Sequence, residues 1–307
     1  MKVDLIIPTY KPNAQFGELM ERLAQQTLQL NRIIIMNTEE DYFLPEMIEG
    51  MDNVEVHHIS KTEFDHGGTR NQGVSYSDAD IICFMTQDAL PANRQVIEEL
   101  VLPFQDEQVA AAYGRQMADA KKNPIEAYTR LFNYPEEDRK KTKEDLAELG
   151  IKTFFCSNVC SAYRRKDYDA MGGFELRTIF NEDMIMASKL IEAGKAVYYA
   201  SNAKVWHWHD YSAKEQLTRN FDLAVSQQMY GGLFLKVKSE SEGIRLVKAT
   251  MLYLLKTGKW YLLPRLIIHS GAKYIGYKLG KNYETLPKTF IKKISMSHSF
   301  WEKTEKK

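Results

Sequence analysis

The chain has few cysteines, and their placement excludes a disulfide-based fold. Only 3 cysteines occur among 307 residues, an odd number that suits neither a paired disulfide framework nor a small secreted domain. Cys156 and Cys160 stand four positions apart rather than in a Cys-x-x-Cys arrangement, and Cys83 lies inside an apolar run. We therefore expect reduced, buried thiols in a cytoplasmic protein.

Long hydrophobic runs, a secretory leader and a net charge are also missing. No uninterrupted apolar run reaches the roughly 20 residues that span a bilayer, and Asp4 interrupts the apolar start where a signal peptide would need its core. The formal net charge is +0, and no nucleic-acid reading motif accompanies the basic residues, so we expect no nucleic-acid partner. A hydrophobic content of 44% is ample for a real core.

Short apolar runs alternate with helical spacing through the N-terminal part of the chain. Phe16, Leu19, Met20 and Leu23 recur at helical intervals between two such runs. This alternation predicts an α/β protein with a mostly parallel, doubly wound sheet, whose ligands bind at the carboxyl ends of the strands. The predicted strands are Val3–Ile7, Ile33–Met36, Val54–Ile59 and Ile81–Met85.

The first strand is not followed by a glycine fingerprint. A dinucleotide oxidoreductase needs Gly-x-Gly-x-x-Gly at that point, whereas this chain has Pro8-Thr9-Tyr10-Lys11-Pro12. The sheet therefore predicts a ligand other than a nicotinamide dinucleotide.

Glycines occur instead in the segment KTEFDHGGTRNQG, residues 61 to 73, where a loop is expected to open into a helix. Backbone N–H groups at a helix start and the guanidinium of Arg70 together suit a phosphate-bearing ligand. In the alternative interpretation the glycines only serve a turn and Arg70 is a solvated surface residue.

These pieces, in this order and spacing, resemble the family 2 inverting glycosyltransferases over roughly residues 1 to 210. The resemblance implies a GT-A fold and inverting transfer from a nucleotide sugar. The alternatives are the same fold with a UDP-sugar donor, or a non-catalytic glycan- or nucleotide-binding module. Two segments, residues 64–71 and 86–89, look like the rhamnosyltransferase branch, whose donor is usually dTDP-L-rhamnose. The matching pieces are Ile6-Ile7-Pro8-Thr9-Tyr10, Gly68-Thr69-Arg70-Asn71-Gln72-Gly73, the strand ending at Asp88, and Asn181-Glu182-Asp183.

The resemblance assigns donor and metal sites along this edge. Asp88 is the expected ligand of a Mg²⁺ or Mn²⁺ ion that neutralises the leaving diphosphate, although Gln87 and Ala89 replace the acidic neighbours common in relatives; in the alternative, Asp88 only caps a turn. His209 and, less favoured, His207 would complete the metal shell or contact the diphosphate, unless the pair is structural. The expected donor-binding residues are Pro8, Thr9, Tyr10, Asn37, Asp65, Gly68, Arg70, Asn71, Gln87 and Asp88.

Many relatives recognise the pyrimidine base with an aspartate in the turn after the second strand, and the sequence of this turn differs here. Residues 36 to 40, Met-Asn-Thr-Glu-Glu, offer an amide and a hydroxyl in place of an aspartate. Asp65 is the alternative acceptor for the ring N–H of the base. The choice between uracil and thymine therefore stays open, and only the resemblance to the rhamnosyltransferase branch favours thymine.

Inverting transfer needs a base that takes the proton of the acceptor hydroxyl. The family pattern assigns this role to Asp183, the second acid of Asn181-Glu182-Asp183, while Glu182 either caps the following helix or meets the acceptor. Ser157, Asn158 and Trp206 are the other expected acceptor residues, with buried packing an equal alternative for Trp206. The charged, helix-prone residues 133–152 are expected to form a plain solvated helix, with a mobile flap as the alternative.

The C-terminal region is basic. Residues 236 to 307 contain about 16 Lys and Arg against about 5 Asp and Glu, with apolar residues at helical spacing from Ile244 to Leu255. We expect a catalytic domain over 1–212 and basic amphipathic helices over 213–307. Such helices suit the inner face of a cell membrane presenting a lipid-linked oligosaccharide or polysaccharide acceptor; in the alternative, they pack on the catalytic domain or on a second subunit of a homodimer.

Overall fold

The computed structural model describes residues 1–234 and 240–305. The chain forms two compact units, each assembled from several segments. The predicted domain boundary at residue 212 stays a prediction. The first unit comprises Met1–Met117, Tyr134–Leu176 and Glu182–His207, and the second comprises Ala118–Asn133, Arg177–Asn181 and Trp208–Lys307.

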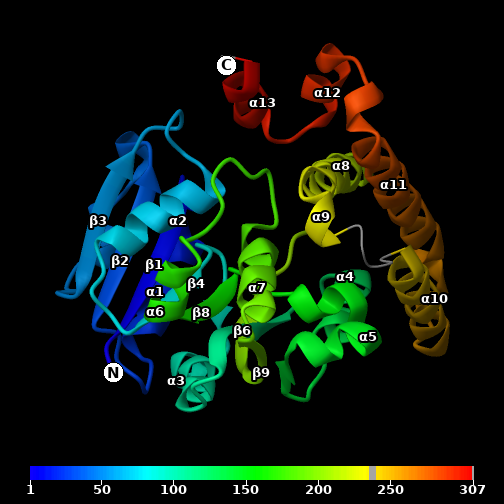
Figure 1. The fold of residues 1–307 in the computed structure, drawn as a ribbon. Helices are drawn as coiled ribbons and strands as arrows, with labels where there is room; N and C mark the ends of the chain where they lie inside the picture. The colour runs from blue at the N-terminus through cyan, green and yellow to red at the C-terminus, as the bar shows by residue number, and fades with distance from the viewer. Residues whose placement is uncertain (235–239, 306–307) are drawn as a thin grey trace. The chain divides into compact units, whose positions relative to one another are not determined.

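One mixed sheet forms the centre of the first unit (Figure 1). The strand order is β3-β2-β1-β4-β8-β6-β9-β5, with β7 paired to β9. Pairing is parallel from β3 to β4 and between β6 and β9, whereas β8, β5 and β7 are antiparallel to their neighbours. The strands are β1 Val3–Tyr10, β2 Arg32–Thr38, β3 Val54–Ile59, β4 Ile81–Met85, β5 Leu90–Pro91, β6 Val109–Met117, β7 Arg139–Lys141, β8 Cys160–Arg164 and β9 Ala196–Trp206.

Helices cover both faces of this sheet, which explains why its central strands are continuously apolar. In β1, Leu5 and Ile7 belong to the hydrophobic cluster that includes Phe16 of α1, while Ile6 belongs to the opposite cluster with Val74 of α2. The predicted α/β architecture is confirmed. Helices of this unit are α1 Ala14–Ala24, α2 His66–Ser75, α3 Val96–Val101, α5 Leu146–Leu149, α6 Arg165–Ala170 and α7 Glu182–Glu192.

The glycines of α2 permit close approach of this helix to its surroundings. A Cβ added to Gly73 would lie 2.6 Å from Cγ2 of Ile6, and one added to Gly67 would lie 2.0 Å from the backbone oxygen of Glu175. Both distances are below any ordinary contact, so these positions need glycine if α2 is to pack as it does.

The solvated helix predicted over residues 133–152 is wrong. This segment contains strand β7, paired antiparallel with β9, followed by short helical turns. Lys141 of β7 is buried and donates through Nζ to the hydroxyl of Tyr113, at 3.2 Å, and to the carbonyl of Phe155. Charged side chains therefore mask an edge strand in the sequence.

The second unit is helical, which confirms the predicted C-terminal helical extension. Helix α11 packs along α8: Cβ atoms added to Gly276 and Gly280 would lie 2.1 Å and 2.3 Å from backbone oxygens of α8. None of the helices in the described part of the chain is long and apolar enough to cross a membrane. The helices are α4 Pro124–Asn133, α8 Ala213–Met229, α9 Gly231–Phe234, α10 Glu240–Lys256, α11 Leu263–Lys281, α12 Lys288–Ile294 and α13 His298–Glu305.

Candidate active site

Two adjacent acids begin helix α7 in the first unit. Glu182 is buried and Asp183 is partly buried. Asn158 meets both: its backbone N–H donates to Oδ2 of Asp183 at 3.1 Å, and its amide Nδ2 donates to Oε1 of Glu182 at 3.3 Å. Nη1 of Arg70 lies 3.3 Å from the same Glu182 oxygen. Three segments distant in sequence thus converge on this acid pair.

The surroundings separate the pKa values of the two carboxyl groups. Burial raises the pKa of Asp183, and the negative charge of Glu182 raises it further, to about 7. Burial acts most strongly on Glu182 and would raise its pKa, but the charges of Arg70 and His66 together with hydrogen bonds, including that from Asn158, outweigh burial and hold the pKa below its ordinary value. Glu182 is therefore ionised at neutral pH while Asp183 can gain or lose a proton, as a general base requires.

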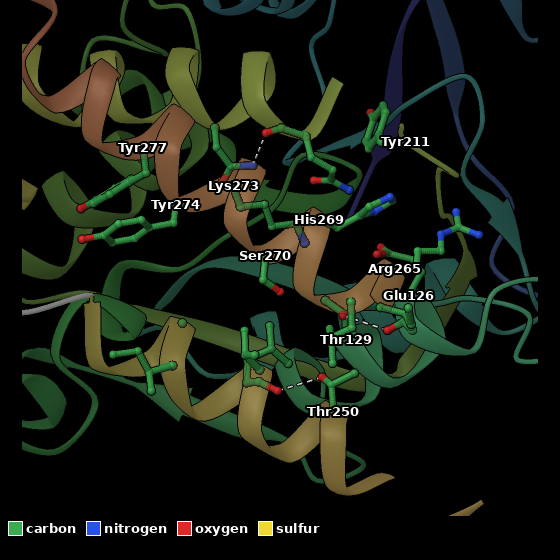
Figure 2. A pocket seen from close by; sticks show the side chains of 18 of the residues that line it. Glu126, Thr129, Tyr211, Thr250, Arg265, His269, Ser270, Lys273, Tyr274 and Tyr277 are labelled. Atoms are coloured by element: carbon green, nitrogen blue, oxygen red, sulfur yellow. Dashed lines mark hydrogen bonds between the residues drawn. The ribbon is translucent and has the colours of Figure 1, made fainter. Parts of the chain in front are cut away.

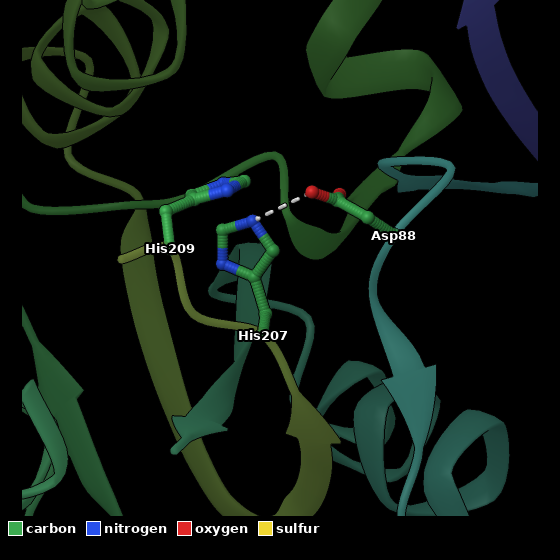
Figure 3. Close-up of side chains that lie close together, drawn as sticks. All are labelled: Asp88, His207 and His209. Atoms are coloured by element: carbon green, nitrogen blue, oxygen red, sulfur yellow. Dashed lines mark ion pairs between the residues drawn. The ribbon is translucent and has the colours of Figure 1, made fainter. Parts of the chain in front are cut away.

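A second polar group lies where β5 and β9 pair. Leu90 of β5 is opposite Trp206 of β9 in antiparallel register, so the residues before β5 lie beside those after β9. Nε2 of His207 lies 3.5 Å from Oδ2 of Asp88. Figure 3 shows His209 beside them, and one ligand atom from each of the three residues lies within 4.8 Å of the others.

Gln116 fixes the imidazole of His207. Its Oε1 lies 3.0 Å from Nδ1 of His207, while its Nε2 donates to Oγ of Ser157 at 2.9 Å. The amide oxygen accepts the Nδ1 proton, which leaves Nε2 and its lone pair directed at the Asp88 carboxylate. Two electron-rich atoms so close require a cation or a proton between them. A carboxylate and imidazoles are ligands that Mn²⁺ accepts, so the residues fit a divalent metal.

The amides expected to bind the donor have partners inside the protein. Asn37 is buried, accepts from Oγ1 of Thr9 at 3.0 Å and donates to the carbonyl of Glu39 at 3.1 Å. The Gln87 amide pairs with the main chain of Tyr10, accepting at 2.8 Å and donating at 3.0 Å. These contacts fix the carboxyl ends of β1, β2 and β4 against one another, and the donor-binding roles stay predictions.

In the glycine segment, Asp65 and Asn71 both serve the local structure. Oδ1 of Asp65 accepts from the N–H of Gly68 at 2.7 Å and caps α2. The Asn71 amide bonds both the N–H and the carbonyl of Phe174 at 2.9 Å, joining α2 to the Gly-Gly-Phe turn. Arg70 is buried against Glu182 rather than solvated. The helix start predicted here is confirmed by the structure.

Two exposed tyrosines form an aromatic pair at the carboxyl edge of the sheet, and the sequence did not predict that they meet. The Tyr10 and Tyr42 rings meet edge to face with centroids 5.8 Å apart, and both are about two-fifths exposed, at 39% and 42%. Nζ of Lys11 lies 4.4 Å from the Tyr42 centroid. Tyr10 was selected from the sequence, but Tyr42 lies in a short 3₁₀ turn, Glu40–Tyr42, without a motif to reveal it. Gln116 was missed for the same reason.

The remaining predicted site residues, three on the acceptor side and one on the donor side, are buried or partly buried. Ser157 and Asn158 are buried beside Gln116 and the acid pair, respectively. Trp206 is partly buried as the last residue of β9. Pro8 is a partly buried residue of β1, two positions before Tyr10.

The mixed α/β sheet has the GT-A fold, in agreement with solved structures. A mannosyltransferase, PcManGT from Pyrobaculum calidifontis in complex with GDP-Man and Mn²⁺, has a TM-score of 0.64 at 14% identity, covering 93% of this chain and 88% of that one. TarS 1-349 of S. aureus in complex with UDP-GlcNAc has a TM-score of 0.52 at 16% identity, covering 92% and 91%.

The family model for glycosyl transferase family 2 matches residues 4–172, and the chain belongs to this family. It is 38% identical to the O-antigen chain rhamnosyltransferase RfbN of Salmonella typhimurium, over 98% of this chain and 96% of the relative. It is 37% identical to the O-antigen chain rhamnosyltransferase WbaN of Salmonella anatum, over 97% and 95%. The chain is a glycosyltransferase, as the sequence predicted.

Proposed function

We propose that this enzyme transfers L-rhamnose from dTDP-L-rhamnose, with inversion at the anomeric carbon, to a lipid-linked precursor of a cell-surface polysaccharide. The observation that carries the proposal is identity of 38% over nearly the full length with an enzyme named as an O-antigen chain rhamnosyltransferase. Because both chains are covered almost completely, the match extends beyond the nucleotide-sugar fold into the C-terminal helices.

Asp183 is the base in this proposal. The acceptor hydroxyl oxygen forms a bond to the anomeric carbon as the carbon–oxygen bond to the diphosphate breaks, and the hydroxyl proton passes to the Asp183 carboxylate. The N–H of Asn158 holds that carboxylate, and ionised Glu182 raises its basicity. Arg70 in turn keeps Glu182 ionised. Ser157, Asn158, Glu182 and Trp206 stand as the proposed acceptor side.

Asp88, His207 and His209 would hold a divalent cation, Mg²⁺ or Mn²⁺. When bound, such an ion stabilises the negative charge of the departing diphosphate. Gln116 presents the Nε2 lone pair of His207 for this purpose. A set containing a single carboxylate leaves room for donor phosphates in the metal shell, so we expect cation and nucleotide to bind together.

The donor nucleotide would lie along the carboxyl edge of β1 and β2. The exposed face of Tyr10 is available to stack on a pyrimidine, with Tyr42 supporting it at the edge. Pro8, Thr9, Asp65, Gly68 and Arg70 complete the proposed donor side. The enzyme would act at the inner face of the cell membrane, where basic amphipathic helices would meet anionic lipid.

Thermal shift with dTDP, UDP and GDP, each with and without Mn²⁺, tests the donor. A nucleotide that binds the native state raises the melting temperature, and the proposal expects the largest shift from dTDP with the cation. Turnover of dTDP-L-rhamnose with a lipid-linked acceptor extract then tests transfer. A larger shift with UDP, followed by turnover of a UDP-sugar, would keep the transferase but replace the sugar.

A further inference from the structure

A cavity of about 770 Å³ lies wholly within the second unit, among helices α4, α8, α10 and α11 (Figure 2). Its volume falls inside the range of roughly 300–1,000 Å³ typical of pockets that enclose a small organic ligand. Helices α10 and α11 are joined through a short 3₁₀ turn, Trp260–Leu262, and α11 is held along α8 at Gly276 and Gly280. The cavity walls are thus mostly helix, with Asn123 and residues 209–211 contributing from loops.

Much of the lining is aliphatic. Leu223 of α8, Ile244 and Val247 of α10, and Leu266 of α11 all border the cavity. Such walls favour a hydrocarbon, since burying apolar surface contributes about 25 cal/mol per Å².

Among the basic side chains in the cavity, the partly buried Lys273 forms no direct ion pair within the part of the chain that the structure describes. Arg265 bonds the carboxylate of Asp210, and the Glu126 carboxylate pairs with Arg130 at 2.9 Å. Nζ of Lys273, by contrast, makes no hydrogen bond or ion pair with another side chain in the described ranges 1–234 and 240–305. Burial lowers the pKa of Lys273, and Glu126 offsets this only in part. An anion beside Nζ would supply the missing partner.

Polar groups accompany Lys273 on the same face of α11. His269 and Ser270 lie four and three positions before it, the spacing that places side chains together on a helix. Figure 2 shows all three side chains coming from α11 at the cavity. Burial, then the charges of Arg265 and Lys273, lower the pKa of His269. A neutral imidazole and a hydroxyl can donate to phosphate oxygens without a second charge.

Exposed apolar side chains adjoin this polar group. Ile244 and Tyr274 line the cavity and are each 60% exposed. On the same helices, Ile267 and Ile268 are 66% and 59% exposed, and Trp260, in the connecting turn, is 67% exposed. Apolar exposure on this scale marks a surface that meets a partner or a membrane. Basic residues Lys248 and Lys256 lie on α10.

We propose that the cavity binds the phosphate-proximal part of a long-chain lipid phosphate or diphosphate, with the head group at Lys273, His269 and Ser270 and the hydrocarbon against the aliphatic walls. The proposal rests on the proposed function, because a lipid-linked acceptor is a molecule of this chemistry. Charge complementarity at Lys273 and the apolar walls select this occupant over a peptide or a free sugar.

Calorimetric titration of the full-length protein with farnesyl diphosphate tests the proposal. Inorganic pyrophosphate supplies the head alone and farnesol the chain alone. We expect saturable binding of farnesyl diphosphate and at least tenfold weaker binding of either part. Equal binding of pyrophosphate and farnesyl diphosphate would overturn the lipid site, since the walls would then contribute nothing.

Two substituted positions distinguish lipid binding in the cavity from non-specific adsorption to the basic surface. Lys273→Met should weaken farnesyl diphosphate binding at least tenfold, and Lys273→Arg should restore most of it. Lys256→Met, an exposed lysine of α10 outside the cavity, is the matched control and should bind like the wild type. Equal losses in Lys273→Met and Lys256→Met would indicate non-specific adsorption and overturn the proposal. Unchanged melting temperatures would establish that both variants fold.

The same preparations separate this inference from the transferase assignment. Asp183→Asn should bind farnesyl diphosphate normally. If dTDP binds and dTDP-L-rhamnose turns over while farnesyl diphosphate gives no heat, the lipid site alone is wrong. If farnesyl diphosphate binds with the expected dependence on Lys273 but no nucleotide sugar is turned over, the proposed function is wrong and the lipid site stands.

Discussion

Gln116 and His207 form a directed pair in which the amide oxygen of Gln116 lies 3.0 Å from Nδ1 of the imidazole. The pair joins β6, which contains Gln116, to the residue that follows β9. The amide nitrogen of Gln116 also donates to Oγ of Ser157, and this second hydrogen bond fixes the direction in which the amide oxygen points. The tautomer of His207 therefore depends on a residue outside the Asp88, His207 and His209 group.

Replacing Gln116 should weaken the metal site. Gln116→Leu removes the acceptor for Nδ1–H, and loss of such a supporting partner typically costs 10–100-fold in metal affinity. We expect that range for Mn²⁺, measured by electron paramagnetic resonance in the presence of dTDP. Gln116→Glu keeps an acceptor and should retain most of the affinity. Gln108→Leu, at an exposed position, serves as the control, and equal affinities in all four proteins would refute the role.

Asp183→Asn should remove transfer and leave nucleotide binding nearly intact. Loss of a general base lowers rates by about 10²–10⁴-fold, while an amide preserves the size of the side chain. Transfer is measured with dTDP-L-rhamnose and nucleotide affinity by titration with dTDP. Asp169→Asn, which alters an exposed ion pair on α6, should change neither quantity. A strong loss of dTDP binding in Asp183→Asn would remove Asp183 from its assigned role.

The rate of transfer should rise with pH through about 7. Asp183 acts only when ionised, and burial together with the charge of Glu182 raises its pKa to about 7. Below that pH, kcat/KM should fall about tenfold per pH unit. Glu182→Gln removes one cause of the raised pKa, so its profile should shift to lower pH. A wild-type profile that is flat from pH 5 to pH 8 would contradict this assignment.

The same raised pKa predicts a pH effect on stability. The folded state holds the Asp183 proton more tightly than the unfolded state, so this group's contribution is fully present below the unfolded pKa and is lost as pH rises through about 7. Asp183→Asn should therefore gain melting temperature relative to the wild type at pH 8 and gain less at pH 5. Thermal denaturation at the two pH values measures the difference. A larger gain in melting temperature at pH 5 than at pH 8 would contradict a raised pKa for Asp183.

Alanine at Gly67 should destabilise the protein. The new Cβ would lie 2.0 Å from the backbone oxygen of Glu175, an overlap that forces α2 away from the Gly-Gly-Phe turn and should cost about 1–3 kcal/mol or more. Gly17→Ala is the matched control, because no atom lies within 4 Å of its added Cβ. There alanine should stabilise helix α1 by about 0.5–1 kcal/mol. Denaturant unfolding compares them, and equal stabilities would refute the packing argument.

The apolar parts of the fold could be predicted from the sequence, whereas long-range polar contacts could not. The predicted bounds of β4 are those of the structure, because a fully buried strand is a continuous apolar run between turns. The predicted bounds of β3 also match, although this strand contains Glu and His and is mostly only partly buried. The three cysteines, all among the described residues, are free and buried as predicted. Strand β7 was missed because Arg139 to Lys141 owe their conformation to pairing with β9, which local propensity does not reveal.

The polar residues at the ligand edge show a related limit. The sequence assigned Arg70 to the donor, Asn158 and Glu182 to the acceptor and Asp183 to catalysis, and these roles stay predictions. The structure brings the four residues together. Asn71, by contrast, was expected to bind the donor, yet its amide joins two parts of the backbone. A pattern locates a polar residue near a site without saying which partner it has.

The reversal of one strand decides where the enzyme can vary. Because β8 runs opposite to β4, with Cys160 beside Met85 and Arg164 beside Ile81, the loop that enters β8 opens at the ligand edge and the loop that leaves it lies at the far edge. Insertions before Cys160 would reshape the surroundings of Asn158 and the acid pair, whereas insertions after Arg164 would leave them unaltered. Acceptor preference can thus diverge through the length of a single entering loop while the donor side of the sheet is preserved.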